Sequence, residues 1–248
     1  MVYEDFAKVY DELMQEINYD EWADYIFRMT LNSTKPIKKI LEFGCGTGNI
    51  TLRLAKKGFD MTAVDLSEDM LTVADEKAEA QGIENVRFFK GDMSNFQIGE
   101  TFDAVIVCCD SFNYLKSLDE IESFLSCSAE ALKPGGLLMF DMNTPEKYKE
   151  TIGDNTFVYN FDNVYCVWEN TLHPDDDKVD FDLSFFVRRE DDLYERYEEE
   201  QSQYYYPVED IFKLLKVPAF KNQKIYDFGT FLAGGALSDR VQYVAEKR

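Results

Sequence analysis

The chain has 248 residues, of which 45% are hydrophobic, and 48 acidic residues outnumber 26 basic ones to give a formal net charge of −22 at pH 7. This length suffices for one substantial domain with an elaboration. So large a negative charge repels phosphate backbones and disfavours a nucleic-acid partner. The apolar runs are far shorter than the ~20 residues of a membrane span. No signal-peptide pattern opens the chain, so we expect a cytoplasmic protein without a membrane segment.

Two amphipathic helices are predicted at the N-terminus. The first is indicated by apolar side chains at helical spacing: Phe6, Val9, Tyr10, Leu13 and Ile17. The second runs from about residue 22 to residue 29. Both would pack against the sheet that the following residues predict.

A strand and a glycine-rich turn come next. The apolar run 37–41 leads into Glu42-Phe-Gly-Cys-Gly-Thr-Gly48, and a helix is expected from about residue 49 to residue 57. Glycines let the main chain turn sharply and approach a ligand, and the helix N-terminus then faces that ligand. A dinucleotide loop would need a third glycine at position 49, where the chain has Asn. The junction therefore favours another nucleotide-like cofactor, with a tight turn that binds nothing as the alternative.

Acidic residues accompany three successive predicted strands. Glu42 precedes the glycines, the strand 60–65 ends in Asp65, and the strand 86–90 is followed by Gly-Asp92-Met93. An acid about twenty residues after the glycine loop can accept hydrogen bonds from both ribose hydroxyls. An Asp followed by an apolar residue suits an adenine. Each acid alone would be an ordinary turn residue or helix cap, but together they favour a nucleotide site.

The α/β pattern continues to about residue 143. A strand over 102–109 ends at Asp110-Ser-Phe-Asn-Tyr114, and Ser117 with Glu120 forms a capping box for a helix to about residue 132. Pro134-Gly-Gly136 then turns into a strand over 137–141.

Residues 145–206 change to an alternating, aromatic pattern that predicts three or four antiparallel strands. An acidic turn at 175–177 would join two of them, and the segment carries a net charge of −11. A helix over 208–215 and strands over 224–228 and 241–245 follow.

The ordered motifs resemble those of class I S-adenosylmethionine-dependent methyltransferases over roughly residues 37–144. The residues that carry the resemblance are Glu42 to Gly48, Asp65, Gly91-Asp-Met93 and Leu132-Lys-Pro-Gly-Gly-Leu-Leu138. The resemblance implies an α/β fold with a Rossmann-like seven-stranded sheet that ends in an antiparallel hairpin. The core would comprise 1–144 and 207–248, with lid helices in 1–34. Residues 145–206 would form a small antiparallel β insertion that caps the substrate.

The same resemblance implies S-adenosylmethionine as the cofactor and S-adenosylhomocysteine as the product. The residues expected to bind it are Gly44, Gly46 and Gly48 for the methionine part, Asp65 for the ribose, Asp92 and Met93 for the adenine, and Asp110 and Ser111 beneath the sulfonium. Glu42, Cys45 and Leu66 are also expected to bind the cofactor, together with Tyr10 and Trp22 from the lid. Tyr19 is a further lid candidate. Plain packing on the sheet is the alternative for the lid residues.

Methyl transfer is an in-line displacement at an activated carbon, so the protein mainly aligns the reactants. Asp110 and Tyr114 are candidates for a catalytic base. Trp168, Tyr204 and Tyr206 are candidates for the walls of the substrate pocket, with core packing as the alternative. His173, the single histidine, lies in a turn that does not favour catalysis. We expect no metal, although Asp110, Asp141 and Asn143 could supply oxygen ligands to Mg²⁺.

We therefore expect a methyltransferase with a small-molecule acceptor. The Pro-Pro tetrad of nucleic-acid amino-methyltransferases is absent after Asp110. A catalytically silent, S-adenosylmethionine-binding sensing or interaction module is the alternative. The five cysteines lack a C-x-x-C pair and are expected to be reduced. The sequence makes no prediction of the oligomeric state.

Overall fold

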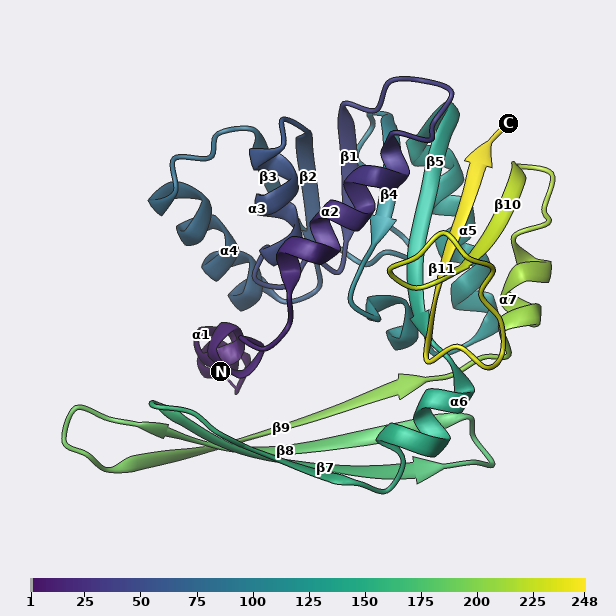
Figure 1. Cartoon of the computed structure of the whole chain (residues 1–248). Coiled ribbons are helices and arrows are strands. Elements are labelled where there is room, and N and C mark those ends of the chain that lie inside the picture. The colour runs from purple at the N-terminus through teal and green to yellow at the C-terminus, as the bar shows by residue number, and fades with distance from the viewer. Residues whose placement is uncertain (1) are drawn as a thin grey trace.

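The computed structural model describes residues 2–248 and contains two β-sheets (Figure 1). The large sheet has seven strands in the order β10-β11-β5-β4-β1-β2-β3, and the small sheet has four in the order β6-β7-β8-β9. This arrangement confirms the Rossmann-like seven-stranded sheet with an antiparallel insertion that the sequence predicts.

Five parallel strands form the first part of the large sheet: β1 Lys39–Phe43, β2 Asp60–Asp65, β3 Val86–Lys90, β4 Phe102–Val107 and β5 Leu132–Asn143. The helices of this part are α2 Tyr19–Thr30, α3 Asn49–Lys56, α4 Glu68–Ala80 and α5 Leu118–Ala131. One apolar core joins α2 and α3 to the sheet, and another joins α5 to its opposite face. Because helices cover both faces, the strands are apolar almost throughout.

Serine caps fix two helix starts, that of α4 at Ser67 and, as predicted, that of α5 at Ser117. The Ser67 hydroxyl accepts from the Met70 backbone N–H, and the Ser117 hydroxyl accepts from that of Glu120. The Glu120 carboxylate, however, accepts from the N–H of Lys116, one residue before the position that a capping box requires.

The structure shifts several predicted strand ends, and two of these shifts have a clear local cause. β4 stops at Val107 because Cys109 and Asp110 adopt left-handed backbone conformations, with φ of 57° and 53°. β5 begins at Leu132, five residues before the predicted start, because Leu132 already pairs with Phe102. Leu137 then pairs with Ala104, so the Pro-Gly-Gly segment bulges between two paired points instead of preceding the strand.

The insertion comprises β6 Thr156–Asn160, β7 Val164–His173, β8 Lys178–Arg188 and β9 Tyr194–Tyr204, all antiparallel. The short helix α6 Pro145–Lys147 and the π-helical turn η2 Tyr148–Ile152 connect it to β5. Helix α1, Val2–Leu13, lies over this small sheet (Figure 1). Phe6 packs on Phe185 with ring centroids 5.5 Å apart, so α1 closes the core of the insertion.

Helix α7 Val208–Leu214 and the antiparallel pair β10 Phe220–Asp227 and β11 Arg240–Lys247 complete the large sheet. The loop 228–239 between these strands folds back toward α2, where the Tyr25 hydroxyl donates to the Thr230 carbonyl at 2.7 Å. All five cysteines are free thiols. Within residues 2–248, no helix has the length and apolar character needed to cross a membrane.

Candidate functional site

The glycine loop between β1 and α3 uses its three glycines for different purposes. All three have positive φ, between 53° and 76°. A Cβ on Gly44 would lie 2.6 Å from the Ser111 Cβ, and one on Gly48 would lie 3.1 Å from the Ala74 Cβ. A Cβ on Gly46 would meet nothing within 4 Å. Gly44 and Gly48 therefore permit close packing, whereas Gly46 presents its backbone to open space, as a ligand cradle requires.

Asp65, at the end of β2, is joined directly to this loop. Its Oδ2 accepts from the Gly46 N–H at 2.8 Å, and its Oδ1 accepts from the Ser67 N–H at 2.9 Å. Burial raises the pKa of Asp65, and these backbone bonds counteract the rise. The next residue, Leu66, leaves 65% of its surface exposed. One oxygen of this carboxylate therefore binds the glycine loop, and the other binds the residue that caps α4.

Glu42 is buried at the end of β1. Its Oε2 accepts from the Thr51 hydroxyl at 2.5 Å. Burial raises the pKa of Glu42 to about 8, and Asp65 contributes to the rise. Glu42 therefore exchanges its proton close to neutral pH.

Asp92 and Met93 follow β3 at the edge of the sheet where β1 and β2 also end. Asp92 Oδ1 accepts from the N–H and the hydroxyl of Ser94, at 2.8 and 2.7 Å. The Met93 methyl carbon lies 3.8 Å from the Cβ position of Gly44. The Ser111 hydroxyl donates to the Gly44 carbonyl at 3.2 Å, so residues after β3 and β4 both meet the glycine loop.

A buried guanidinium connects the ends of β4, β5 and β11. Arg240 donates to Asp110 Oδ1 at 2.7 Å and forms a second ion pair with Asp141 Oδ2. The Asp110 N–H also donates to Asp141 Oδ2, at 2.9 Å. Asn143 Oδ1 accepts from the Lys147 ammonium at 2.9 Å. Each of the three side chains considered as a Mg²⁺ ligand thus has a protein donor.

The insertion reaches this cluster through β9. Gln203 Nε2 donates to Asp110 Oδ2 at 2.8 Å, and Gln203 Oε1 accepts from the Tyr148 hydroxyl at 2.6 Å. The Tyr114 hydroxyl donates to Gln201 Oε1 at 2.5 Å. The two predicted catalytic candidates, Asp110 and Tyr114, therefore both face the same strand of the insertion.

Of the three predicted lid residues, Tyr10 and Trp22 lie near this region, on different sides, while the Tyr19 ring packs 5.6 Å from the Arg53 guanidinium carbon of α3. Tyr10 packs edge-to-face on Phe6, and burial raises its pKa well above the ordinary value, with Tyr19 as the next cause. The phenol is also within electrostatic range of Asp110. The centre of the Trp22 ring lies 4.5 Å from the centre of the Phe228 ring and 5.0 Å from the Arg240 guanidinium carbon.

Asp11 anchors α1 to the glycine loop. Its Oδ1 accepts from the Thr47 hydroxyl at 2.6 Å and from Asn49 Nδ2 at 2.7 Å, and its Oδ2 pairs with the Lys77 ammonium. Sequence reasoning missed Asp11, Gln203 and Arg240. Their partners lie far away in the chain, and no local pattern marks them.

The predicted substrate-side aromatics are dispersed. Trp168 packs edge-to-face on Phe181 inside the insertion, with centroids 5.4 Å apart. The Tyr206 hydroxyl donates to the Leu115 carbonyl at 2.6 Å, and the Tyr204 carbonyl accepts from Asn113 Nδ2 at 2.9 Å. His173 is the last residue of β7, and its Nε2 lies 2.8 Å from Asp180 Oδ2.

Comparison with known proteins identifies the family. A family model described as a methyltransferase domain matches residues 40–136. A relative from Bacillus subtilis (strain 168) that bears the name methyltransferase YqeM is 36% identical over 249 residues, which cover 100% of this chain and 98% of the relative. The chain belongs to the class I S-adenosylmethionine-dependent methyltransferases.

A crystal structure of an S-adenosylmethionine-dependent methyltransferase from Clostridium acetobutylicum ATCC 824 aligns with a TM-score of 0.88 and 33% identity, over 99% of this chain and 98% of that one. A Streptomyces venezuelae N,N-dimethyltransferase of dTDP-3-amino-3,4,6-trideoxy-alpha-D-glucopyranose is 32% identical over 152 residues, or 60% of this chain and 61% of that protein. The predicted family, enzyme class and cofactor are thereby confirmed. The methyltransferase uses S-adenosylmethionine as its methyl donor.

Proposed function

We propose that this methyltransferase acts on a small-molecule acceptor, which binds between the carboxyl ends of β4 and β5 and the β6–β9 insertion. The contact of Gln203 with Asp110 carries this proposal. It places a strand of the insertion directly over the residue expected beneath the sulfonium. In open α/β sheets, ligands bind outside the carboxyl ends of the strands.

On the cofactor side, the open space at Gly46 leaves room for the methionine part, with Glu42, Gly44, Cys45 and Gly48 around it. The residues proposed for the remainder of the cofactor are Asp65 and Leu66 for the ribose, Asp92 and Met93 for the adenine, Asp110 and Ser111 beneath the sulfonium, and Tyr10 from α1. The exposed Leu66 side chain beside Asp65 supports this assignment, since a bound nucleoside would cover it.

When bound, the cofactor supplies an activated methyl group, so the chain has to align the acceptor and exclude water. Asp110 suits alignment better than proton removal. Both of its oxygens already accept hydrogen bonds, from Arg240 and Gln203. The spare lone pairs of the carboxylate can still accept from the acceptor. Tyr114, at the rim, is the second candidate for orienting it.

Charge and relationship both support a small acceptor rather than a nucleic acid. The net charge of −22 opposes binding of a polyanion. The Streptomyces venezuelae relative acts on a nucleotide-linked amino sugar according to its name. We also propose a cytoplasmic location, which the free thiols support.

The test is methyl transfer from isotopically labelled S-adenosylmethionine to a metabolite extract, followed by mass spectrometry. We expect label in one or a few compounds of low mass, and none with an Asp65→Ala control. Label confined to protein or nucleic acid would contradict a small acceptor. Tight binding of S-adenosylhomocysteine without any transfer would favour a silent binding module.

A further inference from the structure

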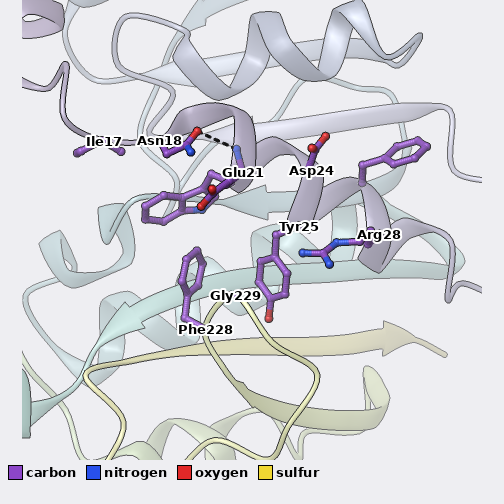
Figure 2. A pocket seen from close by; sticks show the side chains of 10 residues that line it. Ile17, Asn18, Glu21, Asp24, Tyr25, Arg28, Phe228 and Gly229 are labelled. Atoms are coloured by element: carbon purple, nitrogen blue, oxygen red, sulfur yellow. Dashed lines mark hydrogen bonds between the residues drawn. The ribbon is translucent and has the colours of Figure 1, made fainter.

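A groove of about 650 Å³ lies between α2 and the loop that follows β10 (Figure 2). Its α2 side carries the acids Glu21 and Asp24 and the aromatic residues Trp22 and Tyr25. Phe228 lies on the opposite side, facing the helix (Figure 2). The groove therefore combines aromatic faces with carboxylates.

This combination suits an organic cation. Asp24 pairs with the Lys57 ammonium, but no cation pairs with the Glu21 carboxylate among the side chains that the structure describes, which exclude those of residues 1–5 and 8. The Arg28 guanidinium carbon already lies 5.9 Å from the centre of the Tyr25 ring. Cations are attracted to aromatic faces in this geometry.

The wall of the groove is also the back of the proposed acceptor site. Trp22 contacts Phe228 in the groove and the Arg240 guanidinium within the protein, where Arg240 holds Asp110 and Asp141. Trp22 and Arg240 therefore lie between the groove and the carboxylates of Asp110 and Asp141.

Two buried acceptor atoms, one on β5 and one on β11, lack a donor. Asp141 Oδ1 and Gln242 Oε1 have no hydrogen-bond partner within the described part of the chain, and both residues are 1% exposed. Asp141 and Gln242 are paired directly across β5 and β11, so their side chains share one face of the sheet. Trp22 Nε1 is likewise buried without an acceptor. An unpaired buried acceptor is destabilising, so a donor belongs there.

We propose that the methyl acceptor enters through this groove and carries a protonatable amine, which Glu21 and the Trp22–Phe228 pair attract and which donates to Asp141 and Gln242. The proposal rests on the function proposed above. It assigns Trp22 to the acceptor, in place of the cofactor contact that the sequence predicts.

The chemistry balances without a further reactant. The ammonium releases one proton to solvent, and the freed nitrogen lone pair forms a bond to the methyl carbon as the carbon–sulfur bond breaks. The bonding electron pair remains on sulfur, which becomes a neutral thioether. The product is an N-methylammonium that carries the positive charge lost from sulfur.

The test uses the fluorescence of Trp22. The chain has two tryptophans, so a Trp168→Phe protein reports on Trp22 alone. Benzylamine serves as the probe and benzyl alcohol as its uncharged counterpart. We expect saturable quenching by benzylamine with an affinity about tenfold above that for benzyl alcohol. Equal binding of both probes, or quenching that persists in a Trp22→Phe protein, would overturn the proposal.

Two substitutions in the Trp168→Phe background locate the amine. Glu21→Gln should weaken benzylamine binding about fivefold, while the matched Glu76→Gln on the exposed face of α4 should not. Gln242→Leu removes a buried unpaired oxygen and should fold, yet it should also weaken binding. If Glu21→Gln binds benzylamine with unchanged affinity, the groove does not attract the amine through Glu21. If Gln242→Leu does so, the amine does not donate a hydrogen bond to Gln242.

Calorimetry with S-adenosylhomocysteine on the same proteins separates this proposal from the proposed function. We expect every variant to bind the nucleoside as the parent does. Nucleoside binding without benzylamine binding would contradict only the groove, whereas loss of nucleoside binding in the parent would contradict the methyltransferase assignment itself.

Discussion

Gly46 differs from other left-handed glycines by its position rather than by its backbone. Gly82, after α4, has a similar φ of 64°, and a Cβ would meet nothing within 4 Å at either residue. An alanine at either position costs about 1–2 kcal/mol, because a Cβ disfavours the left-handed conformation. Gly46→Ala should additionally lower the affinity for S-adenosylhomocysteine at least about tenfold, since the methyl group enters the proposed ligand space.

Denaturant unfolding and calorimetry on both variants measure these two quantities separately. Gly82→Ala should lose stability and keep the parental affinity. If Gly46→Ala binds the nucleoside as Gly82→Ala does, the backbone at Gly46 does not contact the ligand.

The raised pKa of Glu42 predicts a stability that falls with pH. The Glu42 carboxyl titrates near its ordinary value of 4.5 in the unfolded chain and near about 8 in the folded one. Between these values the folded state keeps a proton that the unfolded state has released. The stabilisation is therefore complete below pH 4.5 and is lost as pH rises toward about 8.

Glu42→Gln should remove this slope, as measured by denaturant unfolding from about pH 5 to about pH 8. Glu100→Gln is the control. The hydrogen bond from Arg87 lowers the Glu100 pKa, so Glu100 is ionised in both states across this window. Parallel stability curves for the parent and Glu42→Gln would contradict a proton on Glu42.

Sequence reasoning could identify the residues next to the glycine loop because their spacing follows from the fold. Glu42 and Asp65 end neighbouring strands, and parallel strands bring their carboxyl ends to one edge. Arg240 gave no such signal. It opens a strand 130 residues after Asp110, and only the pairing of β11 with β5 brings the two together.

At the scale of elements, Asp11 ties α1 to the glycine loop and to α4, in addition to the apolar contacts of the helix. This carboxylate accepts from Thr47 and Asn49 of the glycine loop and pairs with Lys77 of α4. Hydrogen bonds to charged groups contribute about 1.5–3 kcal/mol each. Asp11→Ala should therefore release α1, with faster hydrogen exchange of its amides, while the large sheet keeps its protection.

Asp20→Ala is the matched control. It removes the ion pair between α2 and Arg53 of α3, in which the Asp20 side chain is 79% exposed, and such exposed pairs contribute at most about 1 kcal/mol. Equal exchange rates for α1 in the parent and in Asp11→Ala would show that its apolar contacts alone hold the helix.

The predicted elements agree with the structure where local patterns decide. β2 and β3 have the predicted bounds, since each is a short buried strand with clear turns at both ends. The pattern left the number of strands in the insertion at three or four, and pairing decides for four. β8 continues through Ser184, which faces Val167 and Glu198 of its two neighbours.

For the molecule as a whole, the dominant electrostatic feature is the charge of −22, which predicts that added salt stabilises the fold at neutral pH. Like charges destabilise a compact state, and raising NaCl from about 0.01 M to about 0.1 M shortens the screening length from about 30 Å to about 10 Å. Salt also weakens the surface ion pairs, but each is worth at most about 1 kcal/mol and most are exposed. The loss of repulsion should outweigh the loss of ion pairing, with a rise in stability of about 1–2 kcal/mol, or about 2–8 °C in Tm.

Near the sequence pI of 4.4 the repulsion disappears, so the same salt should then leave Tm unchanged or lower it. A fall in Tm with salt at neutral pH would mean that the ion pairs outweigh the net charge.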